Sequence, residues 1–429
     1  MSSTTAAIAG GKKRPPRQAA VAFIFATALM DVIALGVMVP VLPNLIKTLA
    51  GGDTAEAAAY SLVFASTWGL MQLLFGPVMG LLSDRYGRRP VLLISIFGLG
   101  VDYLFMALAP TLAWLFVGRV INGVTSASFS TANAYIADIA KPEDRAKAFG
   151  LMGAAFGVGF IVGPGVGGLL GHYGLRVPFY VSAALALINW LYGCFILPES
   201  LPPELRAKRL DWRKVAPLAG AVAFYARRRE LLPLAGVYQL FQLAHNAFPS
   251  VFVLYVGFRF GWGPREAGVF LMCTGTVSIL VQVFLIGRAV DRLGERGALM
   301  VGLACAAAAF FVYGLASTPQ VFLMGLLAGA LSGLTGPGLM GLMSRSVGSG
   351  EQGQLQGANS AMTGLSAIVG PAVYLSSLAF SARHPAAAPG LPILIAAVLT
   401  TLGLALAAAT AHPRPARDGR IGAVPPPAP

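Results

Sequence analysis

The amino-acid sequence predicts an all-α membrane protein in which twelve transmembrane helices form two parallel six-helix repeats. Of its 429 residues, 56% are hydrophobic and only 11% are charged, whereas soluble domains carry roughly 25% charged residues. Apolar stretches of about 20 residues, long enough to cross a bilayer, recur along the whole chain. Short motifs of the first half also return at a fixed distance in the second half.

The apolar stretches fall into two sets of six, separated by a polar loop. The run after the basic N-terminal residues continues past Asp31 to about Ile46, which is too long for a signal peptide, so it is predicted to be the first span. The predicted regions are a tail over 1–19, a bundle over 20–197, a central loop over 198–231, a bundle over 232–410 and a tail over 411–429. The predicted spans are 20–45, 60–82, 91–109, 111–137, 148–171, 176–197, 232–257, 265–287, 298–316, 320–343, 355–379 and 391–410.

Basic residues are concentrated on one side of this topology. Of the 31 Lys and Arg residues, 25 lie in the tails, the central loop and the loops after even-numbered spans, and five lie in the opposite loops. The positive-inside rule therefore predicts an inner-membrane protein with both termini and the central loop in the cytoplasm. The net charge of +14 is explained by topology and by attraction to anionic lipid, so no nucleic-acid partner is expected.

The cysteines do not indicate a metal site. Cys194, Cys273 and Cys305 lie in separate apolar runs without the spacing of metal ligands, which favours small core residues. The sequence also lacks a phosphate-binding Gly-rich loop ending in Lys-Ser/Thr, which a nucleotide-driven pump would need. We therefore predict neither a metal nor a cofactor.

An internal repeat with an offset of 207 residues relates the two halves. Gly80, Asp84 and Gly87 return as Gly287, Asp291 and Gly294. Gly163-Pro164 returns as Gly370-Pro371, and Gly150 returns as Gly357. Independent matches at one offset indicate two halves with the same topology, as in a large class of secondary transporters.

The loop that starts at Gly80 connects the predicted second and third spans and reads Gly-Leu-Leu-Ser-Asp-Arg-Tyr-Gly-Arg-Arg. It resembles the signature motif of the major facilitator superfamily, and its degenerate copy at 287–296 occupies that family's second position. The resemblance covers essentially the whole chain. The charges can pair with neighbouring helices and form a conformational latch, or they can serve topology alone. The predicted latch residues are Gly80, Asp84, Arg85, Gly87, Arg88, Arg89, Asp138, Asp291 and Arg292.

The predicted fifth span carries a pattern of glycines that resembles the antiporter motif of the same superfamily. Glycines leave one helix face bare, and a proline bends the helix, so that a neighbouring helix can pack closely and slide. The alternative is ordinary small-residue packing. This pattern favours export, and its residues are Gly150, Gly159, Gly163, Pro164, Gly167 and Gly168.

Several segments resemble the tetracycline/proton antiporters and related drug exporters: Gly118-Arg119, Ala134–Ile139, Gly193–Ser200 and Phe258–Trp262. The resemblance implies exchange of a cytoplasmic drug for incoming protons. Charged groups inside a membrane are costly and therefore indicate function, which makes Asp31, Asp102 and Arg119 the predicted proton-coupling residues. Asp102 and Arg119 match charged positions of those exporters, and a static ion pair is the alternative.

The second half departs from the tetracycline exporters. Ser278 stands where they carry a histidine, and Cys305-Ala306 stands where they carry an aspartate. Proton coupling is therefore predicted to depend mainly on residues of the first half, and the sequence does not establish tetracycline as the substrate. The predicted substrate-binding residues are polar or aromatic side chains in the spans, which can accept flat molecules: Gln72, Asn122, Gln239, Phe241, Gln242, His245, Asn246 and Phe248. A purely structural role for His245 is the alternative.

Together these features predict a proton-coupled exporter of small amphipathic molecules that works by alternating access, as a monomer in the lipid bilayer. An importer or facilitator with the same fold is the main alternative. A membrane-embedded enzyme would need a cluster of His, Asp and Glu residues at a membrane surface, and the sequence shows none.

Overall fold

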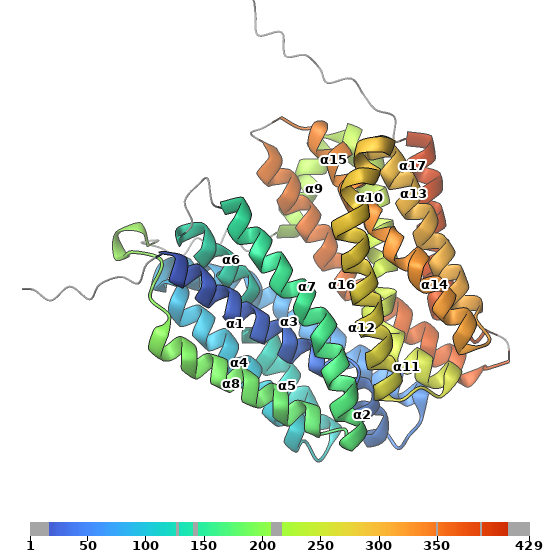
Figure 1. Ribbon diagram of the computed structural model, residues 1–429, viewed down its shortest axis with the longest axis horizontal. Coiled ribbons are helices and arrows are strands. Elements are labelled where there is room, and N and C mark those ends of the chain that lie inside the picture. The colour runs from blue at the N-terminus through green and yellow to red at the C-terminus, as the bar shows by residue number, and fades with distance from the viewer. Residues whose placement is uncertain are drawn as a thin grey trace, which may run out of the picture. The chain divides into compact units, whose positions relative to one another are not determined.

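The computed structural model describes residues 17–125, 128–139, 145–206, 217–348, 351–386 and 388–410. All regular structure in these ranges is helical (Figure 1), which confirms the all-α part of the predicted fold class. The predicted tails before residue 17 and after residue 410 lie outside the described residues, as does the middle of the central loop, 207–216.

Helices follow one another along the described chain with short connections. Before the central loop they are α1 (Arg17–Met38), α2 (Leu42–Leu49), α3 (Thr54–Tyr86), α4 (Arg88–Leu108), α5 (Leu112–Thr125), α6 (Ser128–Ile139), α7 (Arg145–Tyr173) and α8 (Val177–Ile196). The predicted central loop contains α9 (Pro217–Arg227). The helices that follow are α10 (Leu232–His245), α11 (Ala247–Phe260), α12 (Pro264–Val281), α13 (Gly287–Leu315), α14 (Pro319–Leu331), α15 (Thr335–Arg345), α16 (Gln352–Arg383) and α17 (Leu391–Thr410).

Residue contacts divide the chain into two compact units. Unit 1 comprises Met1–Val41 and Leu70–Trp212, and unit 2 comprises Leu42–Gly69 and Arg213–Pro429. The segment 42–69, which belongs to the predicted N-terminal bundle, therefore groups with unit 2 by its contacts.

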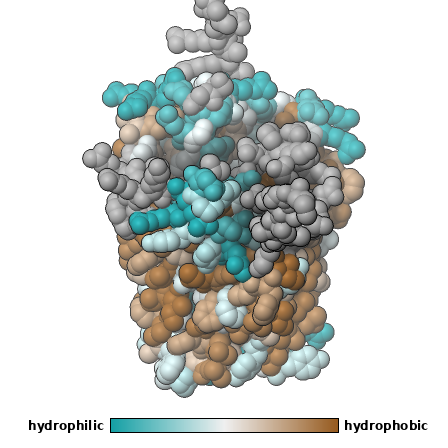
Figure 2. Space-filling model, turned by 90° about the vertical axis from the view of Figure 1, so that its left-hand side faces the viewer, coloured by the Kyte–Doolittle hydropathy of each residue, from teal (hydrophilic) through white to brown (hydrophobic). Residues whose placement is uncertain are grey.

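Ten stretches of the described chain are long and apolar enough to cross a membrane. One of them, Pro264–Leu315, covers two predicted spans, and the predicted span 111–137 includes residues 126–127, which lie outside the described residues. Twelve crossings therefore stay a prediction. The face in Figure 2 shows hydrophobic residues (brown) over a broad area and hydrophilic residues (teal) gathered elsewhere, the segregation that a bilayer requires.

Three predicted spans are interrupted in the structure. The first breaks between Met38 and Leu42, the seventh at Asn246, and the tenth at a 3-10 turn, Ser332–Leu334. Pro40, Pro249 and Pro337 lie at or just after these breaks. Proline has no backbone N–H to donate and its ring crowds the preceding turn, which explains why the helices end there.

The repeat predicted from the sequence has a matching backbone feature. Gly87, directly before α4, has a φ of 108°, and Gly294, 207 residues later, has a φ of 69° inside α13. Both values lie in the region that favours glycine. The two halves therefore use the same kind of glycine kink at the same repeat position.

Candidate functional site

A buried ion pair joins α4 to α5 in unit 1. The Arg119 guanidinium Nη2 donates to Oδ2 of Asp102. Asp102 is fully buried and Arg119 is 8% exposed. Because an isolated charge at this depth would be costly, each partner makes the presence of the other tolerable. The structure thus brings together two of the three predicted proton-coupling residues.

The chain is shaped locally to receive this pair. A Cβ atom on Gly118 would lie 2.7 Å from Oδ1 of Asp102, so glycine leaves the space that the carboxylate occupies. The sulfur atoms of Met38 and Met106 lie 3.7 Å from Nη2 of Arg119. Among the described residues, Oδ1 of Asp102 has no hydrogen-bond partner. That oxygen is therefore the atom of the pair with free capacity to take a proton.

Asp31, the third predicted coupling residue, is also buried in unit 1, on α1. Two buried side chains of α8 hold α1 in place: Ser182 donates to the carbonyl of Ala34 (3.0 Å) and Asn189 donates to that of Thr27 (3.1 Å). The three predicted residues are therefore all buried within unit 1.

The glycines of α7 form its contact with α1. A Cβ atom on Gly163 would lie 2.7 Å from Cα of Gly36, and one on Gly167 would lie 2.0 Å from the carbonyl oxygen of Val37. At Gly159 a Cβ atom would meet Val32 at 2.6 Å. The motif therefore faces the helix that carries Asp31. Pro164 lies inside α7 and Gly168 is buried, whereas the surroundings of Gly150 lie outside the described residues.

The predicted substrate-binding residues are distributed over both units. Gln72 is half-buried on α3 in unit 1, and Asn122 is buried on α5, one helical turn from Arg119. In unit 2 the Phe241 ring stacks on the exposed ring of His245 at 5.8 Å between centroids. Phe248 belongs instead to an aromatic cluster whose other members include Phe252, Phe270, Phe310 and Tyr313.

The remaining predicted substrate residues bond to helix partners in unit 2. Gln239 Nε2 donates to Oγ of Ser366 (2.9 Å), and Gln242 Nε2 donates to Oγ1 of Thr363 (2.9 Å). Asn246 donates to the backbone carbonyl of Gln242 (3.0 Å) at the break between α10 and α11. These amides are therefore positioned by protein groups, and their role toward a substrate stays a prediction.

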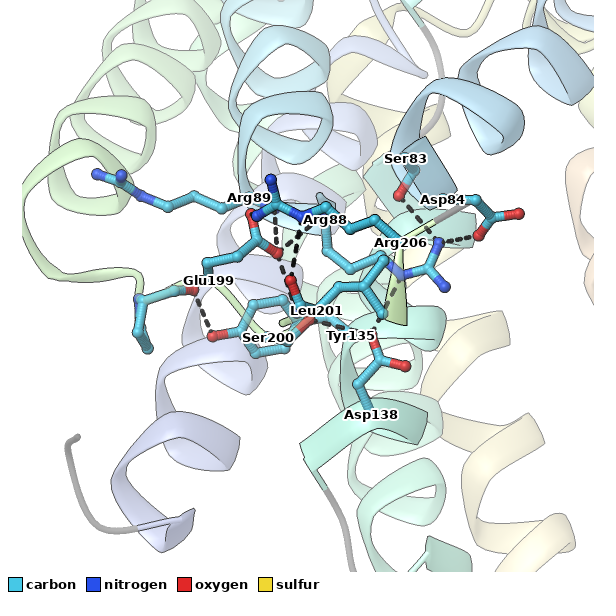
Figure 3. Close-up of polar contacts among 11 residues, drawn as sticks. Ser83, Asp84, Arg88, Arg89, Tyr135, Asp138, Glu199, Ser200, Leu201 and Arg206 are labelled. Atoms are coloured by element: carbon cyan, nitrogen blue, oxygen red, sulfur yellow. Dashed lines mark hydrogen bonds and ion pairs between the residues drawn. The ribbon is translucent and has the colours of Figure 1, made fainter. Parts of the chain in front are cut away.

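A second cluster, the charge network, joins α3, α4, α6 and the segment after α8 in unit 1 (Figure 3). Arg88 is its centre: Nη1 bonds to Asp84 (2.5 Å) and Ser83 (3.2 Å), and Nε bonds to Asp138 (3.1 Å). Arg89 donates instead to the backbone carbonyl of Cys194 (2.6 Å). The predicted pairing of a loop arginine with an acidic residue of a neighbouring helix is present in the structure, between Arg88 and Asp138 of α6. That this pairing acts as a latch and is released during transport stays a prediction.

Not every predicted latch residue joins this network. Arg85 is exposed and lies over the ring of Tyr86 at 5.4 Å. A Cβ atom on Gly80 would meet nothing within 4 Å. Asp291 and Arg292 are exposed and make no ion pair with another described residue. The loop of the first half is thus the more highly connected copy.

Glu199 is a member of the charge network that the site prediction missed. Its carboxylate accepts from the backbone N–H of Arg88 (2.8 Å) and that of Arg89 (3.3 Å), at the N-terminus of α4. A carboxylate at this end of a helix satisfies free N–H groups and complements the helix dipole. A Cβ atom on Gly87 would lie 2.2 Å from the Glu199 carboxylate. Close approach of this carboxylate is therefore a second reason, besides the positive φ, why glycine is needed at position 87. Asp84, which could have faced this helix terminus, bonds to Arg88 instead.

The second half repeats the Arg88–Asp138 pair with its charges exchanged. At the offset of 207 residues Arg88 becomes Glu295 and Asp138 becomes Arg345, and these two side chains pair at 2.8 Å. The Glu295 carboxylate lies against α15, where a Cβ atom on Gly341 would meet it at 2.6 Å. The fold therefore accepts either polarity at this position. Applying the offset to Asp138 would have found Arg345 in the sequence.

This exchange predicts a charge-reversal rescue in the first half. Arg88→Glu places a carboxylate beside Asp84 and Asp138, and we expect the drug efflux predicted from the sequence to fall by roughly tenfold or more, because charge-assisted bonds worth ~1.5–3 kcal/mol are lost. Adding Asp138→Arg recreates the polarity of the second half and should restore much of the efflux. Efflux per amount of membrane-inserted protein is the measurement. A double variant as inactive as the single one would show that pairing is not what matters.

Comparisons with known proteins agree on one family. The family profile described as Major Facilitator Superfamily matches residues 22–371 and 234–426. The chain is 38% identical to Tetracycline resistance protein, class C, of Escherichia coli over 84% of this chain and 89% of that protein. It is 35% identical to the class G protein of Vibrio anguillarum over 84% and 88%. The crystal structure of the human organic anion transporter MFSD10 matches with a TM-score of 0.67 and 23% identity, covering 92% of this chain and 100% of that chain.

Proposed function

The chain belongs to the major facilitator superfamily, and on that premise we propose that it is a proton-coupled exporter of small amphipathic molecules. The buried Asp102–Arg119 pair carries the proposal, because one carboxylate oxygen is bonded to the guanidinium and the other is free to take a proton. The relatives named for tetracycline resistance support an exporter over an importer.

In the proposed mechanism, protonation of Asp102 removes its negative charge and weakens its bond to Arg119. The guanidinium can then be met by an electronegative group of the substrate, so proton and substrate compete for the same pair. Asp31 modulates this exchange from α1. The close glycine contact of α1 with α7 gives α1 a path along which it can shift during alternating access.

We propose tetracyclines as the first substrates to test, because of the names of the relatives. The chain nevertheless places Ser278 on α12 and buried Ala306 on α13, where the tetracycline exporters carry ionisable residues. Coupling would then depend on unit 1, and the neutral amides of α10 would offer hydrogen bonds without a charge. Such a surface suits amphipathic molecules of several kinds.

For topology we propose two bundles, 20–197 and 232–410, in a monomer that crosses the inner membrane with both termini and the central loop in the cytoplasm. The excess of basic residues on that side supports it. Epitope tags at the N-terminus, between 207 and 216 and at the C-terminus should all be inaccessible from outside intact cells. A tag in the central loop that is accessible from outside would overturn this topology.

The function is tested in inside-out membrane vesicles with an established pH gradient. Added tetracycline should release protons from vesicles that contain the protein, and radiolabelled drug should accumulate in the lumen only while the gradient exists. Vesicles with the empty vector are the control. Drug movement that is independent of the gradient would instead support a facilitator, and drug that moves only out of the lumen would support an importer.

A further inference from the structure

Helix α9, inside the predicted central loop, is docked on α16 in unit 2. Its side chains Phe224 and Tyr225 are buried in the same hydrophobic cluster as Leu355 and Ala358 of α16. Directly after α9, the guanidinium of Arg228 bonds to Glu351 at the start of α16 and to Glu230 (3.3 Å). The central loop therefore has a specific, partly apolar attachment to this helix.

The attachment contains a buried hydrogen bond. The Tyr225 hydroxyl donates to Oδ1 of Asn359 at 2.6 Å, and Asn359 is 1% exposed. The amide nitrogen of Asn359 is directed at the sulfur of Met340 (3.4 Å). A buried polar bond of this kind has a fixed geometry, since losing one partner leaves the other unsatisfied.

From Asn359 the bonds continue along α16 to α10. Thr363 Oγ1 donates to the backbone carbonyl of Asn359 (3.1 Å) and lies 2.8 Å from the Tyr238 hydroxyl and 2.9 Å from Nε2 of Gln242. A hydroxyl has one donor and two acceptor sites. The hydroxyl proton of Thr363 is donated to the carbonyl of Asn359, so the Tyr238 hydroxyl must donate to Thr363 Oγ1. Together with the bond from Gln242, this fills all the hydrogen-bonding sites of the Thr363 hydroxyl.

Ser366 adds the last contact, accepting from Gln239 at 2.9 Å. Asn359, Thr363 and Ser366 are spaced by four and three residues, which places them on one face of α16. A small rotation of α16 would therefore move all three together. We call the bonds from Tyr225 through Asn359, Thr363 and Ser366 to the α10 amides the polar ladder.

We propose that Tyr225 is a positioning residue for substrate binding, because through the polar ladder it sets how α16 presents Thr363 and Ser366 to Gln239 and Gln242. This inference rests on the proposed function, in which those two amides contact the substrate. It assigns the central loop a part in affinity, even though α9 itself is not in a predicted membrane span.

The test removes a single hydroxyl. Purified Tyr225→Phe is expected to bind tetracycline with a Kd raised between about two- and tenfold, the range that one net hydrogen bond produces. Tyr255→Phe is the matched control: this buried tyrosine of α11 donates to the backbone carbonyl of Tyr313 at 3.0 Å, outside the polar ladder. It should leave the Kd unchanged. Equal rises in both variants, or none in either, overturn the proposal.

A second readout needs no drug. Hydrogen exchange over 235–245 of α10 should quicken in Tyr225→Phe and not in Tyr255→Phe. If the wild-type protein binds no tetracycline, the proposed function fails for that drug, but the hydrogen-exchange comparison still tests the polar ladder. Faster exchange in Tyr225→Phe alone supports the polar ladder, and equal exchange in the two variants overturns it. Should Tyr225→Phe not reach the membrane, Thr363→Val breaks the polar ladder with α9 still docked and takes the same two measurements.

Discussion

Replacing Asp102 with asparagine is expected to abolish drug-driven proton movement while drug binding stays measurable. Asparagine keeps the shape of the side chain and can accept a bond from Arg119, but it cannot take up or release a proton. Equilibrium binding of tetracycline and drug-induced proton release, measured on the same reconstituted variant, separate the two roles. Normal proton release would exclude Asp102 as the carrier and direct attention to Asp31.

The single variant has a structural cost that must be separated from coupling. Removing one partner of a buried pair leaves the other charge uncompensated, which typically costs about 3–5 kcal/mol. Asp102→Asn/Arg119→Gln removes both charges and should therefore recover thermal stability relative to Asp102→Asn. It should still move no protons. Recovery of proton movement together with stability would identify the pair as purely structural.

The sequence predicted the buried pair because few charges occur in its apolar spans, and a charge in a bilayer must find a partner close by. Asp102 and Arg119 are only 17 residues apart, on consecutive helices. The internal repeat was equally accessible, since the offset of 207 residues can be read by comparing glycines alone. Both predictions depend on local or periodic information.

What could not be predicted depends on contacts between distant segments. Glu199 reaches the start of α4 across 111 residues of sequence, and nothing near Glu199 marks it as a helix cap. Phe248 was predicted to bind substrate from its residue type; the aromatic rings that it packs against could not be foreseen, and its role toward a substrate stays a prediction. Gln239 and Gln242 find hydroxyl partners on α16, more than 120 residues away. The prolines explain the helix breaks, but a proline in a membrane helix can also be tolerated, so the breaks were missed.

Gly167→Ala is expected to stop efflux and to lower the thermal midpoint. The new Cβ atom would lie 2.0 Å from the backbone oxygen of Val37, and a backbone atom has no rotamer that could relieve the clash. The helices α1 and α7 must therefore separate, at a cost of typically ~1–3 kcal/mol for overpacking. Separation also displaces Asp31, which lies six residues before Val37 on α1.

Gly153→Ala is the matched control, since it makes the same substitution on the same helix at an exposed position where a Cβ atom meets nothing within 4 Å. It should leave efflux intact, because alanine is a better helix former than glycine. Efflux and thermal midpoint are measured for both variants at equal membrane content. If Gly167→Ala keeps its efflux, then α1 and α7 can separate without loss of transport, and the glycine motif has no role in transport. Efflux lost in Gly167→Ala with an unchanged midpoint would indicate that the contact serves the motion of α1 and not the stability of unit 1.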